Sequence, residues 1–161
     1  TYGDWSSDVC SSDLGMLAGF IGCHLTLPLT GIGVSREPSD QVPLVLKEAQ
    51  SILDLLQTGQ RVAESAVRCE GGWWQPKYSL PNQAMVEAVQ MLARTEAILL
   101  DPVYTGKIMA GLIGMARRGA LKAGEKVLFM HTGGLPALHM YEPVVLGEVD
   151  LPPVPGQAGP H

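Results

Sequence analysis

Apolar residues recur along this chain at spacings that predict alternating helices and strands. Residues 42–57 give the strongest signal, because apolar side chains stand at positions 42, 45, 46, 49, 52, 53 and 56. That repeat places them on one face of a helix with 3.6 residues per turn. Further helices are expected at residues 15–24, 79–94 and 107–117. Short apolar runs predict strands at residues 30–34 and 126–130, of which the second is the clearer.

Turn-forming residues set the expected boundaries of these elements. Ser79 is expected to cap a helix, with Pro81 in its first turn, where a missing N–H costs no hydrogen bond. Weaker signals predict a strand or helix at residues 61–68 and a strand or turn at residues 98–100. The alternation of strands and helices predicts an α/β fold, a three-layer sandwich around a mainly parallel sheet.

The two ends of the chain differ from this pattern. Within residues 1–14, the stretch from Trp5 to Val9 is echoed by the next five residues, with neither a helical nor a strand period. We interpret residues 1–14 as a translated sequencing adapter, a non-native segment; the alternative is a polar N-terminal extension. Residues 146–161 hold four prolines and three glycines, which predicts a disordered tail. The expected folded domain is therefore residues 15–145.

Composition and charge narrow the class of protein. The chain has 161 residues, enough for one core, and 46% of them are hydrophobic while 17% are charged. So little charge predicts that part of the exterior lies against a missing half or a second subunit. The net charge of −5 and the scattered basic residues argue against nucleic acid, and no apolar run approaches the roughly 20 residues that cross a bilayer. Three cysteines without ligand spacing indicate neither a disulfide framework nor a metal site, and the expected location is the cytoplasm.

Two polar segments carry the candidate chemistry. Residues 101–107 (Asp-Pro-Val-Tyr-Thr-Gly-Lys) and 131–138 (His-Thr-Gly-Gly-Leu-Pro-Ala-Leu) each stand where a strand or turn gives way to a helix. Ligands of open α/β sheets bind at such places, so together the segments predict one small-molecule pocket. From spacing alone, Thr105 is an N-cap or first-turn residue and Tyr104 a half-buried core aromatic. His131 is expected to be a hydrogen-bonded histidine at a strand end, in preference to a pocket wall.

Four motifs together resemble one family. Tyr-Ser-Leu-Pro at 78–81, Ala-Arg-Thr-Glu at 93–96 and the segments 101–107 and 131–138 are similar, in order and spacing, to the C-terminal half of the D-cysteine desulfhydrase and 1-aminocyclopropane-1-carboxylate deaminase family. The resemblance covers about residues 15–141. It implies pyridoxal 5′-phosphate as cofactor and an incomplete fold type II domain like that of the tryptophan synthase β-subunit. It also implies a small amino-acid substrate and a homodimer of the full-length protein.

The resemblance also implies roles for five residues. Tyr104 matches the family tyrosine that stands over the cofactor, and Thr105 matches the position that faces the pyridine nitrogen. Tyr78, 26 residues before Tyr104, matches the second active-site tyrosine, so both tyrosines are expected to be catalytic. Tyr78, Thr132 and Gly133 are expected to contact the substrate. No metal ligand is expected.

Two of these positions bear on the reaction. The deaminases resemble one another in carrying Glu at the position of Thr105 and Leu at that of Thr132, whereas desulfhydrase-like members carry Thr at the second. A carboxylate would keep the ring nitrogen protonated and deepen the electron sink, which a neutral hydroxyl does less strongly. The resemblance thus implies β-elimination of D-cysteine to pyruvate, ammonia and hydrogen sulfide. L-cysteate sulfo-lyase and 1-aminocyclopropane-1-carboxylate deaminase are alternatives within the family, and a non-catalytic α/β binding module is the alternative outside it.

The chain departs from the family pattern in three respects. Lys77 stands where the family usually has glycine before the second tyrosine. The family's Schiff-base lysine lies in the N-terminal half, which this chain does not include, and Lys107 is rejected for that role. The glycine-rich phosphate loop of the family would fall just before Gly15. We therefore expect an enzyme as the parent protein and no activity from this chain alone.

Overall fold

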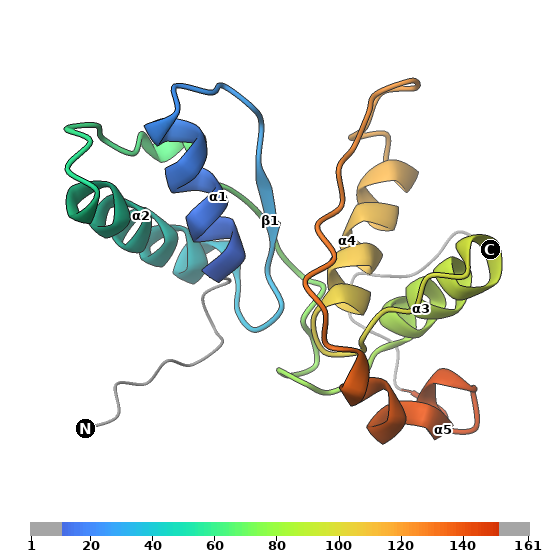
Figure 1. The fold of residues 1–161 in the computed structure, drawn as a ribbon. Helices are drawn as coiled ribbons and strands as arrows, with labels where there is room; N and C mark the ends of the chain where they lie inside the picture. The colour runs from blue at the N-terminus through green and yellow to red at the C-terminus, as the bar shows by residue number, and fades with distance from the viewer. Residues whose placement is uncertain (1–10, 152–161) are drawn as a thin grey trace, which may run out of the picture.

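The structure is a computed structural model that describes residues 11–151 (Figure 1). The helices and strands follow one another as α1 (Ser11–Gly22), β1 (Thr30–Ile32), α2 (Pro38–Leu55), the 3₁₀ helix η1 (Glu64–Ala66), β2 (Arg68–Glu70), α3 (Gln83–Glu96), α4 (Thr105–Arg117), the 3₁₀ helix η2 (Leu135–Tyr141) and α5 (Glu142–Val145). In Figure 1, α1, α2 and β1 lie together on one side, and α3, α4 and α5 on the other. Among the described residues, no helix is both long and apolar enough to cross a membrane.

A small parallel sheet joins the first set of elements. β1 pairs with β2 in parallel, with Thr30 opposite Arg68 and Ile32 opposite Glu70. α1 and α2 pack beside it and bury a cluster of Leu14, Leu17, Val45 and Ala49. Parallel strands need a long crossover, which α2 supplies here. The predicted α/β class with a parallel sheet is confirmed, although within residues 11–151 the sheet has only two strands.

The second set of elements packs around α3 and α4. Their shared cluster consists of Met85, Val86, Ala88, Val89, Leu100, Met109 and Ala110. Glycines on α4 allow close approach to the rest of the molecule. A Cβ at Gly111 would fall 2.6 Å from Cδ1 of Ile32 on β1, and one at Gly114 would fall 2.0 Å from Cη2 of Trp73. The small residues of α4 therefore bring the two sides of the molecule together.

The segment predicted as the clearest strand is not one. Residues 126–130 have no strand partner among the described residues. Val127, Leu128 and Met130 are exposed, Leu128 to 80%. A strand is defined by pairing with a neighbour, and an apolar run within one segment cannot supply that neighbour. Residues 98–100 likewise form no strand, whereas the weak signal at 61–68 corresponds to η1 and the start of β2.

Helix α3 begins later than the sequence predicted. Its N-cap is Asn82, whose side-chain oxygen accepts a hydrogen bond from the N–H of Met85 at 2.9 Å. Ser79 lies in the preceding loop with φ of 60° and caps nothing. Asn82 and Ser79 both belong to the residue types that cap helices, so type alone did not choose between them.

The predicted end segments are described only in part. Residues 1–10 and 152–161 lie outside the described residues. Ser11–Leu14, assigned to the non-native segment, form the first turn of α1, and Leu14 is buried in the core. Within the predicted tail, Leu151 packs against the cluster of α3 and α4. The origin of residues 1–14 stays a prediction.

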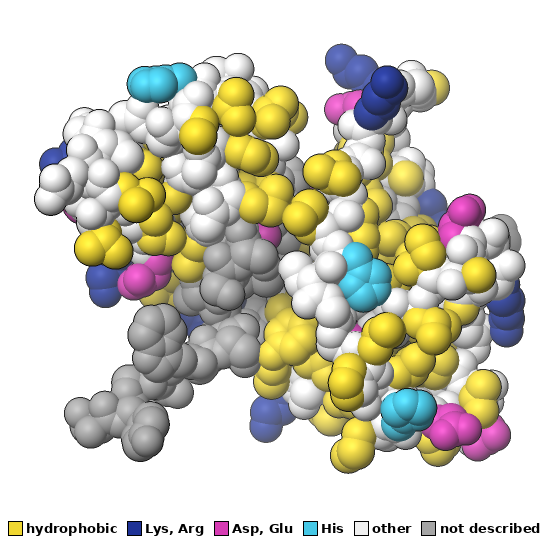
Figure 2. All heavy atoms as spheres, in the orientation of Figure 1, with side chains coloured by type: hydrophobic (Ala, Val, Ile, Leu, Met, Phe, Trp, Pro, Cys, Tyr) yellow, Lys and Arg dark blue, Asp and Glu magenta, His cyan; other side chains and the backbone are white. Residues whose placement is uncertain are grey.

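Hydrophobic side chains also remain on the surface. On the face drawn in Figure 2 they are spread over both sides of the molecule and border the hollow between them. Exposed members include Leu27, Leu99, Leu128 and Met140. The sequence prediction that part of the exterior lies against another body agrees with this exposure and stays a prediction.

Candidate functional site

The turn before α4 is built around a buried carboxylate. Asp101 is completely buried, and its side chain accepts hydrogen bonds from the N–H groups of Val103, Tyr104 and Thr105 at 2.7–2.8 Å. Val103 and Tyr104 lie in the turn that leads into α4 and Thr105 is its first residue, so the carboxylate stands at the N-terminal end of the helix, where the helix dipole favours a negative charge. Asp101 therefore starts α4. Sequence reasoning did not select it, although an Asp-Pro pair directly before a helical pattern was the available signal.

Thr105 completes the same network. Its hydroxyl donates to Oδ1 of Asp101 at 2.7 Å and accepts from the N–H of Asp101 at 2.8 Å. The side chain is completely buried. The prediction of a first-turn residue is confirmed, because α4 begins at Thr105. Its role toward a pyridine nitrogen stays a prediction, and in this structure the hydroxyl is directed to Asp101.

The structure brings the two predicted tyrosines together. The ring centroids of Tyr78 and Tyr104 lie 6.0 Å apart at an interplanar angle of 61°, which is an edge-to-face contact. Their hydroxyl groups are hydrogen-bonded to each other. Both side chains are half-buried. Two phenols that lie 26 positions apart in the sequence thus form one unit at the start of α4.

Two buried side chains hold the loop that carries Tyr78. Nζ of Lys107 donates to the carbonyl oxygens of Trp74 at 2.8 Å and Lys77 at 3.2 Å. The side-chain amide of Asn82 donates to the carbonyls of Trp73 at 3.0 Å and Gln75 at 2.7 Å. Burial lowers the pKa of Lys107 to about 8, because the charged form loses its hydration. Sequence reasoning predicted neither contact.

The second polar segment packs on the Asp101 turn, whereas the small-molecule pocket expected at the two segments stays a prediction. Gly134 has φ of 91°, and a Cβ there would fall 2.7 Å from Cγ of Asp101. The ring of His131 is fully hydrogen-bonded: Nδ1 accepts from the N–H of Gly133 at 3.2 Å, so Nε2 donates to the carbonyl of Leu99 at 2.8 Å. The expected hydrogen bonding of His131 is confirmed, but its expected place at a strand end is wrong, because residues 126–130 form no strand.

The other two predicted residues of this segment are accessible. Thr132 is exposed, and Gly133 is half-buried with φ of 97°, a conformation that favours glycine. Their contact with a substrate stays a prediction.

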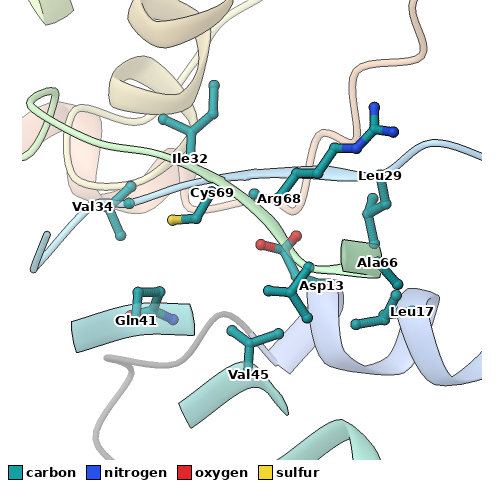
Figure 3. A pocket seen from close by; sticks show the side chains of 13 residues that line it. Asp13, Leu17, Leu29, Ile32, Val34, Gln41, Val45, Ala66, Arg68 and Cys69 are labelled. Atoms are coloured by element: carbon teal, nitrogen blue, oxygen red, sulfur yellow. The ribbon is translucent and has the colours of Figure 1, made fainter. Parts of the chain in front are cut away.

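Neither of the two described cavities is lined by the tyrosine pair. One, of about 30 Å³, lies between α1, α2 and the sheet and includes Asp13 and Cys69 (Figure 3). Burial raises the pKa of Asp13 to about 6, and in Figure 3 the guanidinium of Arg68 points away from this carboxylate. Burial likewise raises the pKa of Cys69 to about 11. The other cavity, of about 410 Å³, lies between α3 and the η2–α5 region.

Comparison with known proteins assigns the family. Residues 14–133 match the model of the family described as pyridoxal-phosphate dependent enzyme. The match covers most of the chain, so this chain belongs to that family. This confirms the resemblance to the deaminase and desulfhydrase family and the fold type II α/β class.

Named relatives add detail. The chain is 39% identical over 131 residues to the 1-aminocyclopropane-1-carboxylate deaminases of Ralstonia pickettii (strain 12J) and Pseudomonas syringae pv. syringae (strain B728a). The match takes in 81% of this chain and 39% of each relative, so the chain spans about two fifths of their length. A solved structure described as "Crystal Structure Analysis of the ACC deaminase homologue" matches with a TM-score of 0.66 at 29% identity, covering 85% of this chain and 42% of that one.

The described residues fit one wall of a pyridoxal-phosphate site. The tyrosine pair presents two aromatic faces and two hydroxyl groups. The start of α4 does not fit the phosphate, because Asp101 already places a negative charge there. Lys107 does not fit the covalent anchor, since its amine is buried against two carbonyls, and the other lysines of residues 11–151 are exposed.

Proposed function

We propose that the protein containing this chain is a pyridoxal-phosphate-dependent lyase acting on a small amino acid. In this proposal, the described residues form the wall that faces the substrate. Family membership supports the class of enzyme. The observation that carries the assignment of the wall is the hydrogen-bonded pair Tyr78–Tyr104. When bound, the cofactor supplies the electron-withdrawing chemistry at the α-carbon of the amino acid.

The tyrosine pair suits proton handling beside a substrate. When two phenols are hydrogen-bonded in series, one O–H donates to the other oxygen, and the second O–H is directed to a third group. Such a group in an amino acid is the carboxylate or the atom that receives a proton after bond cleavage. The proposed roles of Tyr78 and Tyr104 are therefore to orient the substrate and to move a proton at their hydroxyl oxygens.

The first candidate reaction is the deamination of 1-aminocyclopropane-1-carboxylate. Its support is the similarity to curated relatives that carry this name, at 39% identity. This ordering differs from the sequence expectation, in which D-cysteine came first. We propose D-cysteine β-elimination as the second candidate, and the observation that favours it is Thr105. A neutral, fully hydrogen-bonded hydroxyl stands there in place of a carboxylate.

Kinetics of a full-length protein that includes this chain would test the proposal. Release of ammonia and a four-carbon 2-oxoacid from the cyclopropane substrate is measured beside release of sulfide from D-cysteine, with L-cysteine as a control. Turnover of either substrate supports the lyase, and the ratio of the two kcat/KM values chooses between the candidates. Absence of both activities, and of sulfite release from L-cysteate, in a protein that binds the cofactor would contradict the lyase and favour a binding module. A homodimer and a cytoplasmic location stay predictions.

A further inference from the structure

The loop between β2 and α3 directs its carbonyl groups inward. Five of them accept hydrogen bonds from side chains: those of Trp73 and Gln75 from Asn82 at the end of the same loop, those of Trp74 and Lys77 from Lys107, and that of Ser79 from the hydroxyl of Tyr141. Loops usually satisfy such groups with water at the surface. Here two of the three donor residues, Lys107 in α4 and Tyr141 in η2, lie outside the loop, so its shape depends on the tertiary structure.

Lys107 is the unusual member of this set. It is completely buried, and no ion pair joins it to a carboxylate of the described residues. A buried ammonium without a counter-charge is costly, and an apolar side chain of similar length would fill the same space without that cost. What the ammonium group of Lys107 does in this structure is donate hydrogen bonds to two backbone carbonyl groups.

The hydrogen bonds of Lys107 connect the segment that carries Tyr104 with the segment that carries Tyr78. Lys107 lies three residues after Tyr104, in the first turn of α4. One of its two acceptors is the carbonyl of Lys77, the residue directly before Tyr78. A single side chain thus spans the two segments that carry the phenols. Loss of the hydrogen bond to the Lys77 carbonyl would release the part of the loop from which Tyr78 projects.

We propose that Lys107 is a positioning residue that holds Tyr78 against Tyr104 by binding the carbonyl oxygens of Trp74 and Lys77. Any consequence for catalysis rests on the function proposed above, whereas the positioning itself is measurable without it. Lys107 acts through the loop and contacts neither substrate nor cofactor in this proposal. A lysine that only stabilised the fold would lower the free energy of unfolding but leave the contact between the two phenols intact wherever the chain is folded.

Nuclear magnetic resonance of the 161-residue chain with carbon-13 at Cζ of tyrosine would test the proposal. Tyr104→Phe removes one of the two hydroxyl groups. The resulting change in the Cζ chemical shift of Tyr78 therefore reports whether the two hydroxyl groups are in contact. We expect this change in the unmodified chain and in the control Lys77→Met, an exposed lysine of the same loop whose backbone carbonyl is retained. In Lys107→Met the change should vanish. If it persists in folded Lys107→Met, Lys107 does not position Tyr78 and the proposal is overturned.

A second measurement needs no variant at Lys107 and decides the matter if Lys107→Met does not fold. The Cε signal of Lys107 and the Cζ signal of Tyr78 are followed while the pH passes through the Lys107 pKa of about 8. Loss of the ammonium charge weakens both carbonyl contacts, so the two signals should share one midpoint. If the Tyr78 signal does not change when Lys107 loses its proton, the proposal is contradicted. Failure of the lyase assays would leave either result unchanged, which separates this inference from the proposed function.

Discussion

The hydroxyl of Thr105 donates to the carboxylate of Asp101, and the backbone N–H of Asp101 donates back to that hydroxyl. Both residues are completely buried. This reciprocal pair closes the turn that starts α4 and sets the position of Tyr104, which lies between them in the chain. Thr105, which the family resemblance assigned to the cofactor, therefore also stabilises the fold. Both roles would use the same hydroxyl group.

Removing the Thr105 hydroxyl should destabilise the chain. Thr105→Val keeps the shape but leaves the N–H of Asp101 buried without its acceptor, which should lower the free energy of unfolding by about 1–3 kcal/mol. Thr105→Ser retains the hydroxyl and should cost less. Urea unfolding of the three proteins would check this. Equal stability of the Val and Ser variants would mean that the reciprocal pair contributes nothing measurable.

The two tyrosine hydroxyl groups should act as one unit in the full-length enzyme. Tyr78→Phe or Tyr104→Phe alone should lower kcat by roughly 10²–10⁴, the range of general acid–base catalysis. Because the hydroxyl groups are hydrogen-bonded to each other, the double change should cost little more than the more severe single change. Steady-state kinetics of the four proteins gives the comparison. Strictly multiplicative losses would show that the phenols work independently.

The indole of Trp73 should leave no space for a side chain at position 114. A Cβ there would fall 2.0 Å from the indole, so Gly114→Ala should lower the free energy of unfolding by about 1–3 kcal/mol through overpacking. The matched control is Gly19→Ala in α1, where an added Cβ would meet no atom within 4 Å beyond its chain neighbours and the backbone of its own helix, and where alanine should stabilise the helix by about 0.5–1 kcal/mol. Thermal unfolding should thus move in opposite directions for the two variants. A stabilised Gly114→Ala variant would show that Trp73 gives way without strain.

Because of Asp13, the free energy of unfolding should be higher in mild acid than at neutral pH. Burial raises its pKa from 3.8 to about 6, so between these values the folded chain binds more protons than the unfolded chain. Stability from this group therefore falls as the pH rises from about 4 to about 6, and the penalty persists at pH 7. Asp13→Asn should remove that slope and raise the free energy of unfolding at neutral pH by about 2 kcal/mol, allowing for the partial exposure of the side chain.

Chemical unfolding of both proteins across this pH range would check the prediction. Cys69 also has a raised pKa, of about 11, but it titrates far above the window and does not disturb the comparison. Parallel pH profiles for the unmodified chain and Asp13→Asn would contradict the origin of the slope in Asp13.

Several features were determined by the sequence itself because their cause is local. The 3.6-residue repeat predicted the helices that became α2, α3 and α4, within a few residues at their ends. The order of polar motifs identified the family, which the comparison confirmed. The small-molecule pocket expected at the two polar segments stays a prediction, and the approach of Gly134 to Asp101 is a tertiary contact.

Only the tertiary structure decided the rest, because those features depend on what lies opposite a residue. Residues 126–130 have strand-like composition but no partner strand among residues 11–151, so they stay unpaired. Asn82 caps α3 in place of Ser79, and its amide also binds two carbonyls of the preceding loop. Nothing in the sequence indicated a special role for Lys107. Its complete burial against the backbone of a distant loop arises from packing between segments 30 and 33 positions apart, which no local pattern encodes.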